Sequence, residues 1–361
     1  MICARPHLQS LTPYGLGILS PGDDGPQPVS LAQNESAVPP SPSAIEAAII
    51  AARSASVYSD ADWTVLRRAL SDVYDLDPAA ILCGAGSMEL IALIMHAFAG
   101  PGTQVLSTEY AYAFFRTAAE ISGAEYVSVS EQEMMVSVDA VLDGVTSATR
   151  VVSIANPGNP SGTRIASSEV RRLRDGLSGD ILLVIDEAYG EFSDDLDGRL
   201  FDLIERGDTV VLRTLSKAYG LAGMRVGWGT FPLEIASEVR KIQPPGSVSA
   251  ASLAAAEAAV RDQVYMQNTV RETRRLRNGF LQQLPKDGIR VWQSFTNFVL
   301  LEFESQAAAQ SADKALRTEG LVMRGMTGYG LPQCLRATIA AEAYMARAAA
   351  VLRDWSERSR A

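Results

Sequence analysis

The sequence predicts an α/β protein whose large domain has a mostly parallel sheet and is followed by a smaller α+β domain. The chain has 361 residues, two or three times the length of a typical domain. Between about residues 60 and 235, short apolar runs alternate with helical patterns, which favours a parallel sheet covered on both faces. After Pro244 and Pro245 the pattern changes. We expect an N-terminal arm at 1–43, a large domain at 44–245 and a small domain at 246–361.

The arm and the large domain follow from local composition. The first 43 residues are rich in Pro, Gly and Ser, which predicts irregular structure, and a helix is expected at 43–53 with Ser43 as its cap. The expected strands are 80–83, 103–106, 126–129, 150–155, 181–185, 209–212 and 225–229. Helical patterns fall between most of them, for example at 63–74, 87–99 and 167–177. Such sheets bind ligands beyond the carboxyl ends of their strands.

The small domain begins with a long helical region at 249–284, rich in Ala and Arg, which we expect at the domain junction. The segments that follow predict a mixed α+β layer. The expected strands are 289–292, 298–303, 321–324 and 334–339, and the expected helices are 307–319 and about 341–356.

Composition excludes several functions. A net charge of −10 argues against nucleic acid or an acidic membrane as partner. The three cysteines and two histidines are too few and too widely spaced for a disulfide framework or a metal site. No apolar run reaches the roughly 18 residues that a membrane helix needs, and the N-terminus has no apolar signal-peptide core. We therefore expect a cytoplasmic protein without a metal.

The most informative segment runs from Leu212 to Gly229. An expected strand leads into Thr214, Ser216 and Lys217, and a glycine-rich turn then leads to Arg225. Hydroxyls and a guanidinium at the end of a parallel strand suit a phosphate, and a lysine held there could be a nucleophile. Spacing alone fits a surface lysine in a loop equally well.

A second signal is the strand at 181–185, which ends in Asp186. A carboxylate at the end of a buried strand needs a partner, and a protonated pyridine nitrogen is one such partner. Tyr189 follows at a spacing that could return its hydroxyl to the same pocket. A metal-binding or capping aspartate and a nucleotide hydrolase are the alternatives.

Two turns complete the pattern. The turn at 156–162 has two prolines and two glycines and holds Asn159 as a neutral hydrogen-bond donor, although a purely structural turn explains it as well. The turn at 83–89 precedes an expected helix whose first amides could bind an anion. It has neither the GxGxxG spacing of dinucleotide-binding proteins nor the GK[ST] of a P-loop.

These segments, in this order, resemble the fold-type-I enzymes that use pyridoxal 5′-phosphate (PLP), and they are most similar to the histidinol-phosphate aminotransferase family. The resemblance covers nearly the whole chain. Beyond the segments above, it includes 11–14, 41–46, 58–60, 330–332 and 335–336. It implies that an amino group passes from a donor such as histidinol phosphate to a 2-oxo acid such as 2-oxoglutarate.

The resemblance also implies roles for individual residues at the PLP ring. Lys217 would anchor PLP covalently and carry the proton that leaves the donor. Asp186 would keep the pyridine nitrogen protonated. Asn159 and Tyr189 would donate to the phenolic oxygen, and Tyr112 would stack on the ring. Lys217, Asp186 and Tyr189 are thus the catalytic candidates.

At the phosphate, the resemblance assigns a cradle formed by Gly86, Ser87, Met88, Thr214, Ser216 and Arg225. Tyr58 resembles a tyrosine that reaches this phosphate from the other subunit, so a homodimer with a shared active site is implied.

For the substrate, Arg336 matches the arginine for the α-carboxylate and Arg324 the arginine for the distal phosphate. Tyr14 lies on an arm that closes over the substrate. Asn34 is a further substrate-binding candidate, in the segment 34–40, which reads NESAVPP where the family usually has NENP followed by GP. Met88 also stands where the family often has an acidic residue.

These departures leave three reactions open on the same cofactor. The first is histidinol-phosphate transamination, and the second is transamination of an aromatic or specialised-pathway amino acid. The third is a PLP-dependent decarboxylation or β-elimination, because Lys217 and Asp186 would serve each of them. A PLP-binding regulatory domain fits less well, since the chain leaves no room for an added DNA-binding module.

Overall fold

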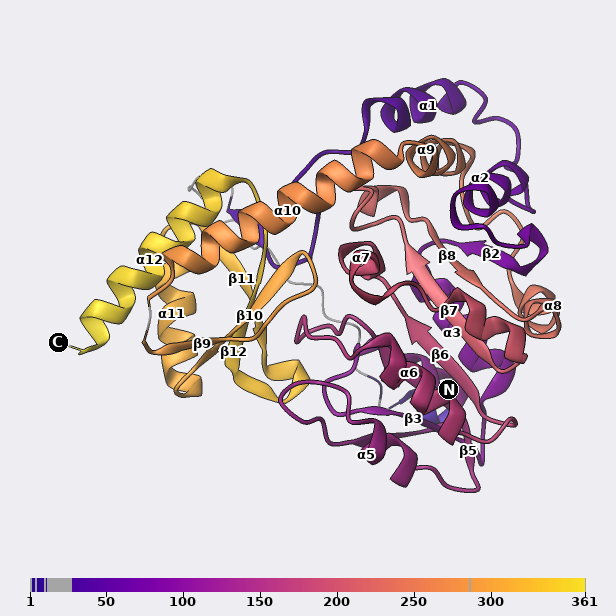
Figure 1. Cartoon of the computed structure of the whole chain (residues 1–361), viewed down its shortest axis with the longest axis horizontal. Helices are drawn as coiled ribbons and strands as arrows, with labels where there is room; N and C mark the ends of the chain where they lie inside the picture. The colour runs from indigo at the N-terminus through magenta and orange to yellow at the C-terminus, as the bar shows by residue number, and fades with distance from the viewer. Residues whose placement is uncertain (1, 4, 10, 12–27, 286, 361) are drawn as a thin grey trace.

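A computed structural model describes residues 2–3, 5–9, 11, 28–285 and 287–360. The described chain forms two sheets, each packed with helices, and the long helix α10 (Gln263–Gln283) runs from the larger part toward the smaller one (Figure 1). No helix among these residues is long and apolar enough to cross a membrane.

The larger sheet has seven strands in the order β2-β8-β7-β6-β5-β3-β4. Their bounds are β2 (Ile81–Gly84), β3 (Gln104–Thr108), β4 (Glu125–Val129), β5 (Thr149–Ala155), β6 (Leu182–Asp186), β7 (Thr209–Thr214) and β8 (Gly227–Thr230). All neighbours are parallel except β8, which is antiparallel to both β2 and β7. The central strands are buried along their length, as expected for a sheet covered on both faces. The mostly parallel sheet is therefore confirmed.

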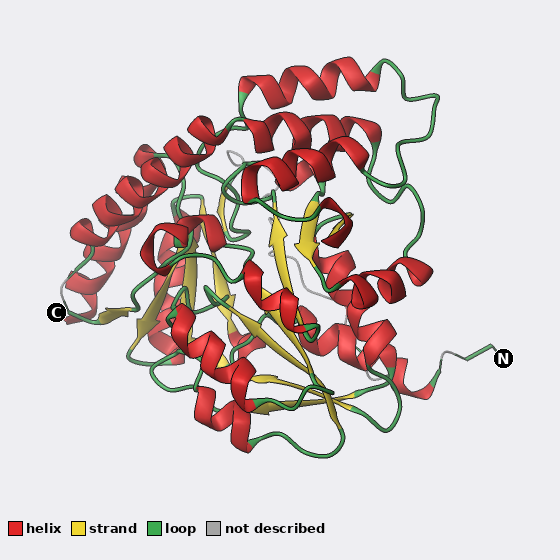
Figure 2. Cartoon of the chain, turned by 45° about the vertical axis from the view of Figure 1, so that its right-hand side comes forward, coloured by secondary structure: helices red, strands yellow, loops and turns green. Residues whose placement is uncertain are grey.

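Helices enclose this sheet, as Figure 2 shows. They are α1 (Pro42–Ala52), α2 (Thr64–Tyr74), α3 (Ser87–Phe98), α4 (Phe114–Ser122), α5 (Val138–Asp143), α6 (Ser167–Gly176), α7 (Asp194–Asp197), α8 (Leu233–Ile242) and α9 (Ala250–Arg261). The prediction that Ser43 caps the first helix is wrong: the side chain of Ser41 accepts from the Ala44 amide at 3.3 Å. Pro42 occupies the first helical position, where its missing N–H costs nothing, so the helix begins one residue earlier.

The smaller sheet has the order β1-β11-β12-β10-β9. Its strands are β1 (Val29–Leu31), β9 (Ile289–Val291), β10 (Phe298–Phe303), β11 (Leu321–Met326) and β12 (Leu331–Thr338), and its further helices are α11 (Gln306–Thr318) and α12 (Glu342–Arg360). β1 comes from the expected arm and pairs parallel with β11, so this part of the arm is not irregular. Short 3-10 helices lie at Pro6–Leu8, Pro78–Ala80, Gly190–Phe192, Phe201–Arg206, Ala222–Met224 and Thr327–Tyr329.

The helical region expected at 249–284 is divided in two. α9 ends at Arg261, and Asp262 caps α10 by accepting from the Tyr265 amide at 3.1 Å. This break lets α9 pack on the larger part while α10 extends to the smaller one, where it packs against α12 (Figure 1). The carboxyl ends of β5, β6 and β7 lie at one edge of the large sheet, and the candidate site lies beyond it.

Candidate active site

A cavity of about 450 Å³ lies between the two sheets. The large part contributes the carboxyl ends of β5, β6 and β7 and the start of α3, while the small part contributes β11 and β12. The charged side chains that line it are Glu35, Asp186, Lys217, Arg225, Arg324 and Arg336. Cationic side chains outnumber acidic ones there, so the cavity suits anions although the chain as a whole is acidic.

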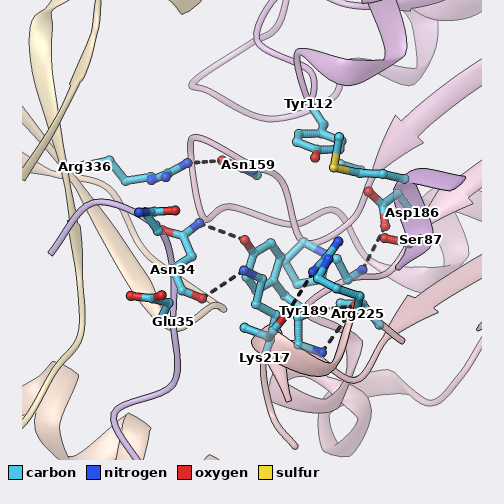
Figure 3. Close-up of a pocket in the computed structure, with 18 of the residues that line it drawn as sticks. Asn34, Glu35, Ser87, Tyr112, Asn159, Asp186, Tyr189, Lys217, Arg225 and Arg336 are labelled. Atoms are coloured by element: carbon cyan, nitrogen blue, oxygen red, sulfur yellow. Dashed lines mark hydrogen bonds between the residues drawn. The ribbon is translucent and has the colours of Figure 1, made fainter. Parts of the chain in front are cut away.

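Lys217 lies just after β7, and its position is set by Asn34. Its Nζ donates to the backbone oxygen of Asn34 at 2.9 Å, and Figure 3 shows the two residues facing each other. Burial, together with the nearby guanidiniums of Arg336 and Arg225, lowers the pKa of Lys217 from 10.5 to about 7. A substantial fraction of the amine is therefore neutral near pH 7, as a nucleophile or a base requires.

Asp186 is the last residue of β6, and its side chain is buried at 4% exposure. One carboxylate oxygen accepts from the Ala188 amide at 3.1 Å. Burial raises the pKa of Asp186 from 3.8 to about 7, and the hydrogen bond from the Ala188 amide and the charge of Lys217 only partly oppose this shift. A cationic group placed against Asp186 would restore its charged form.

Tyr189 and Asn159 are held by residues from distant parts of the chain. The hydroxyl of Tyr189 accepts from Nδ2 of Asn34 at 2.8 Å, and burial raises the pKa of this phenol, which keeps it protonated. The side-chain oxygen of Asn159 accepts from Nη1 of Arg336 at 2.5 Å, and Nη2 of Arg336 donates to the Ala32 oxygen at 2.9 Å. These bonds link β12 and the segment that follows β1 to the cavity-lining residues Tyr189 and Asn159 of the large part.

The start of α3 forms the other end of the cavity. Gly86 precedes the helix at a φ of 86°, and a Cβ there would lie 2.5 Å from Nη2 of Arg225. Glycine thus allows the guanidinium to approach the helix amides, where an anion is favoured. The hydroxyls of Thr214 and Ser216 lie 3.0 Å apart at the same end. Ser87 and Met88 also line this end of the cavity.

The structure brings most of the predicted residues together at this cavity; the exceptions are Tyr58 and Tyr14. Tyr112 lines the cavity and packs against Phe114 and Phe115, at ring-centroid distances of 6.3 and 5.9 Å. Tyr58 does not line the cavity, and its side chain is fully exposed in the single chain. Tyr14 lies outside the described residues.

Sequence reasoning gave no role to Gln33 and Glu35, which line the cavity on either side of Asn34. The one sequence signal was their position on either side of Asn34, a substrate-binding candidate. Only the pairing of β1 with β11 shows that this segment passes along the cavity.

The residues present fit PLP. Asp186 offers a partner to a pyridinium, Tyr112 offers an aromatic face, and Lys217 offers an amine. The start of α3 with Arg225 offers a phosphate cradle at the opposite end. Among the described residues, no group of His, Cys, Asp and Glu could hold a metal ion.

Comparison with known proteins gives a consistent result. Residues 26–352 match the family model described as aminotransferase class I and II. A histidinol-phosphate aminotransferase of Ruegeria sp. (strain TM1040) is 42% identical over 325 residues, which are 90% of this chain and 90% of that protein. Another, of Paracoccus denitrificans (strain Pd 1222), is 40% identical over 324 residues, covering 90% of this chain and 88% of that protein.

Solved structures extend this similarity. The histidinol-phosphate aminotransferase of Sinorhizobium meliloti, in complex with pyridoxal-5′-phosphate, has a TM-score of 0.89 and 27% identity, covering 99% of this chain and 98% of that one. An L-threonine-O-3-phosphate decarboxylase of Porphyromonas gingivalis has a TM-score of 0.79 at 21% identity, covering 91% and 99%. The second similarity shows the fold alone, so the fold does not choose between the two reactions.

Proposed function

The chain belongs to the class I and II aminotransferase family, whose members use PLP, and we propose that its amino donor is histidinol phosphate and its acceptor a 2-oxo acid such as 2-oxoglutarate. We also propose that it works in the cytoplasm as a homodimer. The observation that carries the substrate proposal is the placement of two arginines on the small sheet.

Arg324 on β11 and Arg336 on β12 are direct partners in the antiparallel register of these strands. Side chains of directly opposed residues lie on the same face of a sheet, and both arginines line the cavity. Two guanidiniums on one wall of the cavity favour anionic groups there. A phosphate or a carboxylate, each with several oxygens, suits the planar fork of a guanidinium.

The two substrates can share this pair because they bind in alternate half-reactions. Histidinol phosphate has a phosphate ester and no carboxylate, whereas 2-oxoglutarate has two carboxylates. We place the donor's phosphate at Arg324 and the acceptor's α-carboxylate at Arg336, in agreement with the sequence resemblance. The bond from Arg336 to Asn159 fixes the guanidinium beside the cofactor-binding turn.

The side chains around the reacting atoms would hold and move protons. When bound, PLP supplies an electron sink that stabilises negative charge at the donor's Cα. Lys217, with its lowered pKa, can take the proton from Cα and return it. Asp186 would hold a positive charge on the bound cofactor, and Tyr189 would donate to it from a hydroxyl that stays protonated.

The homodimer proposal rests on exposed apolar side chains. Ile45, Ile49 and Ile50 lie on α1 and are 44%, 57% and 56% exposed, and Val57 and Tyr58 follow at 69% and 100%. Several exposed apolar residues within one short stretch of chain are typical of an interaction site. A second copy fits best, because Tyr58 would then reach the partner's phosphate cradle. The cytoplasmic proposal is supported by Cys83 and Cys334, which are buried and carry free thiols.

The test is a donor panel with 2-oxoglutarate, followed by Arg324→Ala. We expect the parent to use histidinol phosphate in preference to unphosphorylated amino acids. In the variant, kcat/KM for histidinol phosphate should fall by a factor that corresponds to about 2–5 kcal/mol, because a charge pair is broken in a closed site. The matched control is Arg290→Ala, since Arg290 lies on β9 of the same sheet, is exposed and pairs with Glu133 outside the cavity.

Equal losses for phosphorylated and unphosphorylated donors in Arg324→Ala would contradict the assignment of Arg324. Absence of histidinol-phosphate turnover by the parent would favour an aromatic or specialised amino donor. Release of CO₂ or of a β-substituent from the donor would instead indicate a decarboxylase or a lyase.

A further inference from the structure

Arg213 is a fully buried charge that the function proposed above does not use. It lies on β7 after the apolar residues Val210, Val211 and Leu212, has no solvent exposure and does not line the cavity. Thr214, the next residue, does line the cavity, and successive side chains of a strand point to opposite faces. Arg213 therefore faces away from the cavity, behind the cofactor-binding residues.

Two carboxylates hold the Arg213 guanidinium through several hydrogen bonds. Nε and Nη2 donate to Oε2 of Glu187 at 3.0 and 2.7 Å. Nη1 and Nη2 donate to the two carboxylate oxygens of Asp194 at 2.8 and 2.7 Å. The ring of Phe201 lies 4.8 Å from the guanidinium carbon, so the group is fixed in orientation as well as in charge.

The partners of Arg213 belong to the turn that presents Asp186 and Tyr189. Glu187 directly follows Asp186, and Gly190 directly follows Tyr189. A Cβ at Gly190 would lie 2.6 Å from Cζ of Arg213, which shows how closely the guanidinium approaches the backbone there. Arg213 thus contacts the residue that directly follows Asp186 and the residue that directly follows Tyr189.

Arg213 also belongs to the strand that leads to Lys217. The backbones of the two segments are joined at the same level, where the Glu187 amide donates to the Leu212 oxygen at 2.8 Å. We propose that Arg213 is a positioning residue for transamination, which holds the Asp186–Tyr189 turn in register with the segment that ends in Lys217. It does so without contacting substrate or cofactor.

The proposal predicts that a positive charge alone is not sufficient at position 213. Lysine keeps the charge, but it cannot donate to two carboxylates from a rigid planar fork. In Arg213→Lys we expect the PLP dissociation constant of the cofactor-free protein to rise and kcat to fall, each by roughly 10- to 100-fold. KM for the amino donor should change by less than about threefold, because Arg324, the residue proposed to bind the donor's phosphate, lies on the other sheet.

Arg174→Lys provides the matched control. Arg174 is equally buried, but it donates to the backbone oxygens of Ile181 and Asp208, at 2.8 and 3.0 Å. These residues precede β6 and β7, so Arg174 lies at the opposite end of the same two strands. We expect Arg174→Lys to lower Tm about as much as Arg213→Lys does, with PLP affinity and kcat close to the parent values. Equal losses of PLP affinity in both variants would overturn the proposal, because Arg213 would then act only through general stability.

A second variant keeps the test decisive if Arg213→Lys does not fold. Glu187→Gln preserves the size of the partner on the turn and removes its charge, and it should also weaken PLP binding by roughly tenfold. Unchanged PLP affinity in this variant would likewise overturn the proposal. The inference rests on the family assignment and not on the donor: PLP affinity is measured without any amino donor, so its outcome is independent of histidinol phosphate.

Discussion

Asp186→Asn should stabilise the cofactor-free protein while it removes most of the activity. The pKa of Asp186 is raised from 3.8 to about 7 by burial, so the folded protein binds a proton there that the unfolded chain releases. Stability is therefore lost as pH rises from about 4 to 7, and the full cost remains above pH 7. Each pKa unit corresponds to about 1.4 kcal/mol, so the cost approaches about 4 kcal/mol at pH 8. Asparagine removes it, since its side-chain oxygen can still accept from the Ala188 amide.

The measurement is denaturant unfolding of the cofactor-free parent and variant at pH 8 and pH 4.5. We expect the variant to be more stable by about 4 kcal/mol at pH 8 and by only about 1 kcal/mol at pH 4.5, while transamination by the PLP-loaded variant falls by orders of magnitude. Asp202→Asn is a suitable control, because Asp202 pairs with Arg171 at the surface and its loss should change stability by about 1 kcal/mol or less. If Asp186→Asn destabilises the protein equally at both pH values, Asp186 is not a strained buried carboxylate and the reasoning fails.

Three further predictions concern the cofactor. Purified parent protein should be yellow and should retain PLP on Lys217 after borohydride reduction, as seen by peptide mass spectrometry; Lys217→Ala should lose both this adduct and turnover. Gly86→Ala should weaken PLP binding, measured by titration, because a Cβ at this φ of 86° would displace Arg225. Tyr58→Ala should raise the PLP dissociation constant roughly tenfold with little change in Tm, since the side chain is exposed in the single chain; an unchanged constant would remove Tyr58 from the shared site.

The sheet was predictable because its signals are local. Apolar runs that end in polar residues marked β6 and β7, and these strands end where the sequence places Asp186 and Thr214. The composition of β8 does not reveal that this strand runs antiparallel to its neighbours. Its direction follows from the connection after β7, where residues 215–226 contain only a short 3-10 helix and cannot form the longer helical crossover that a parallel neighbour needs.

The site was predictable to the extent that motifs follow strands. Most of the predicted residues line one cavity because the carboxyl ends of β5, β6 and β7 meet at one edge. The contributions of the first 43 residues were harder to predict, because β1 has three residues and joins a strand almost 300 positions away. The placement of Asn34 between Tyr189 and Lys217 depends on this long-range pairing and has no local signal.

Arg213 escaped sequence analysis for a different physical reason. An arginine beside a lysine motif is easily assigned to the ligand, yet its burial at the end of an apolar strand demands carboxylates from the protein itself. Those carboxylates, Glu187 and Asp194, were visible in the sequence, but only the fold shows that they face Arg213 and not the cavity.

The two faces of the turn after β6 treat charge in opposite ways. Behind the turn, Arg213 is paired with Glu187 and Asp194 within the protein, so its charge is neutralised before any ligand binds. In front of it, burial shifts the pKa of both Asp186 and Lys217 toward 7, so each is held away from its usual charged form. A ligand that brings a cation to Asp186 and accepts the Lys217 amine relieves both costs at once. The internally paired face thus keeps the turn rigid, and the face with unfavourable charges gains stability from cofactor binding. Asp186 and Lys217 therefore destabilise the empty protein for the same reason that they serve the chemistry.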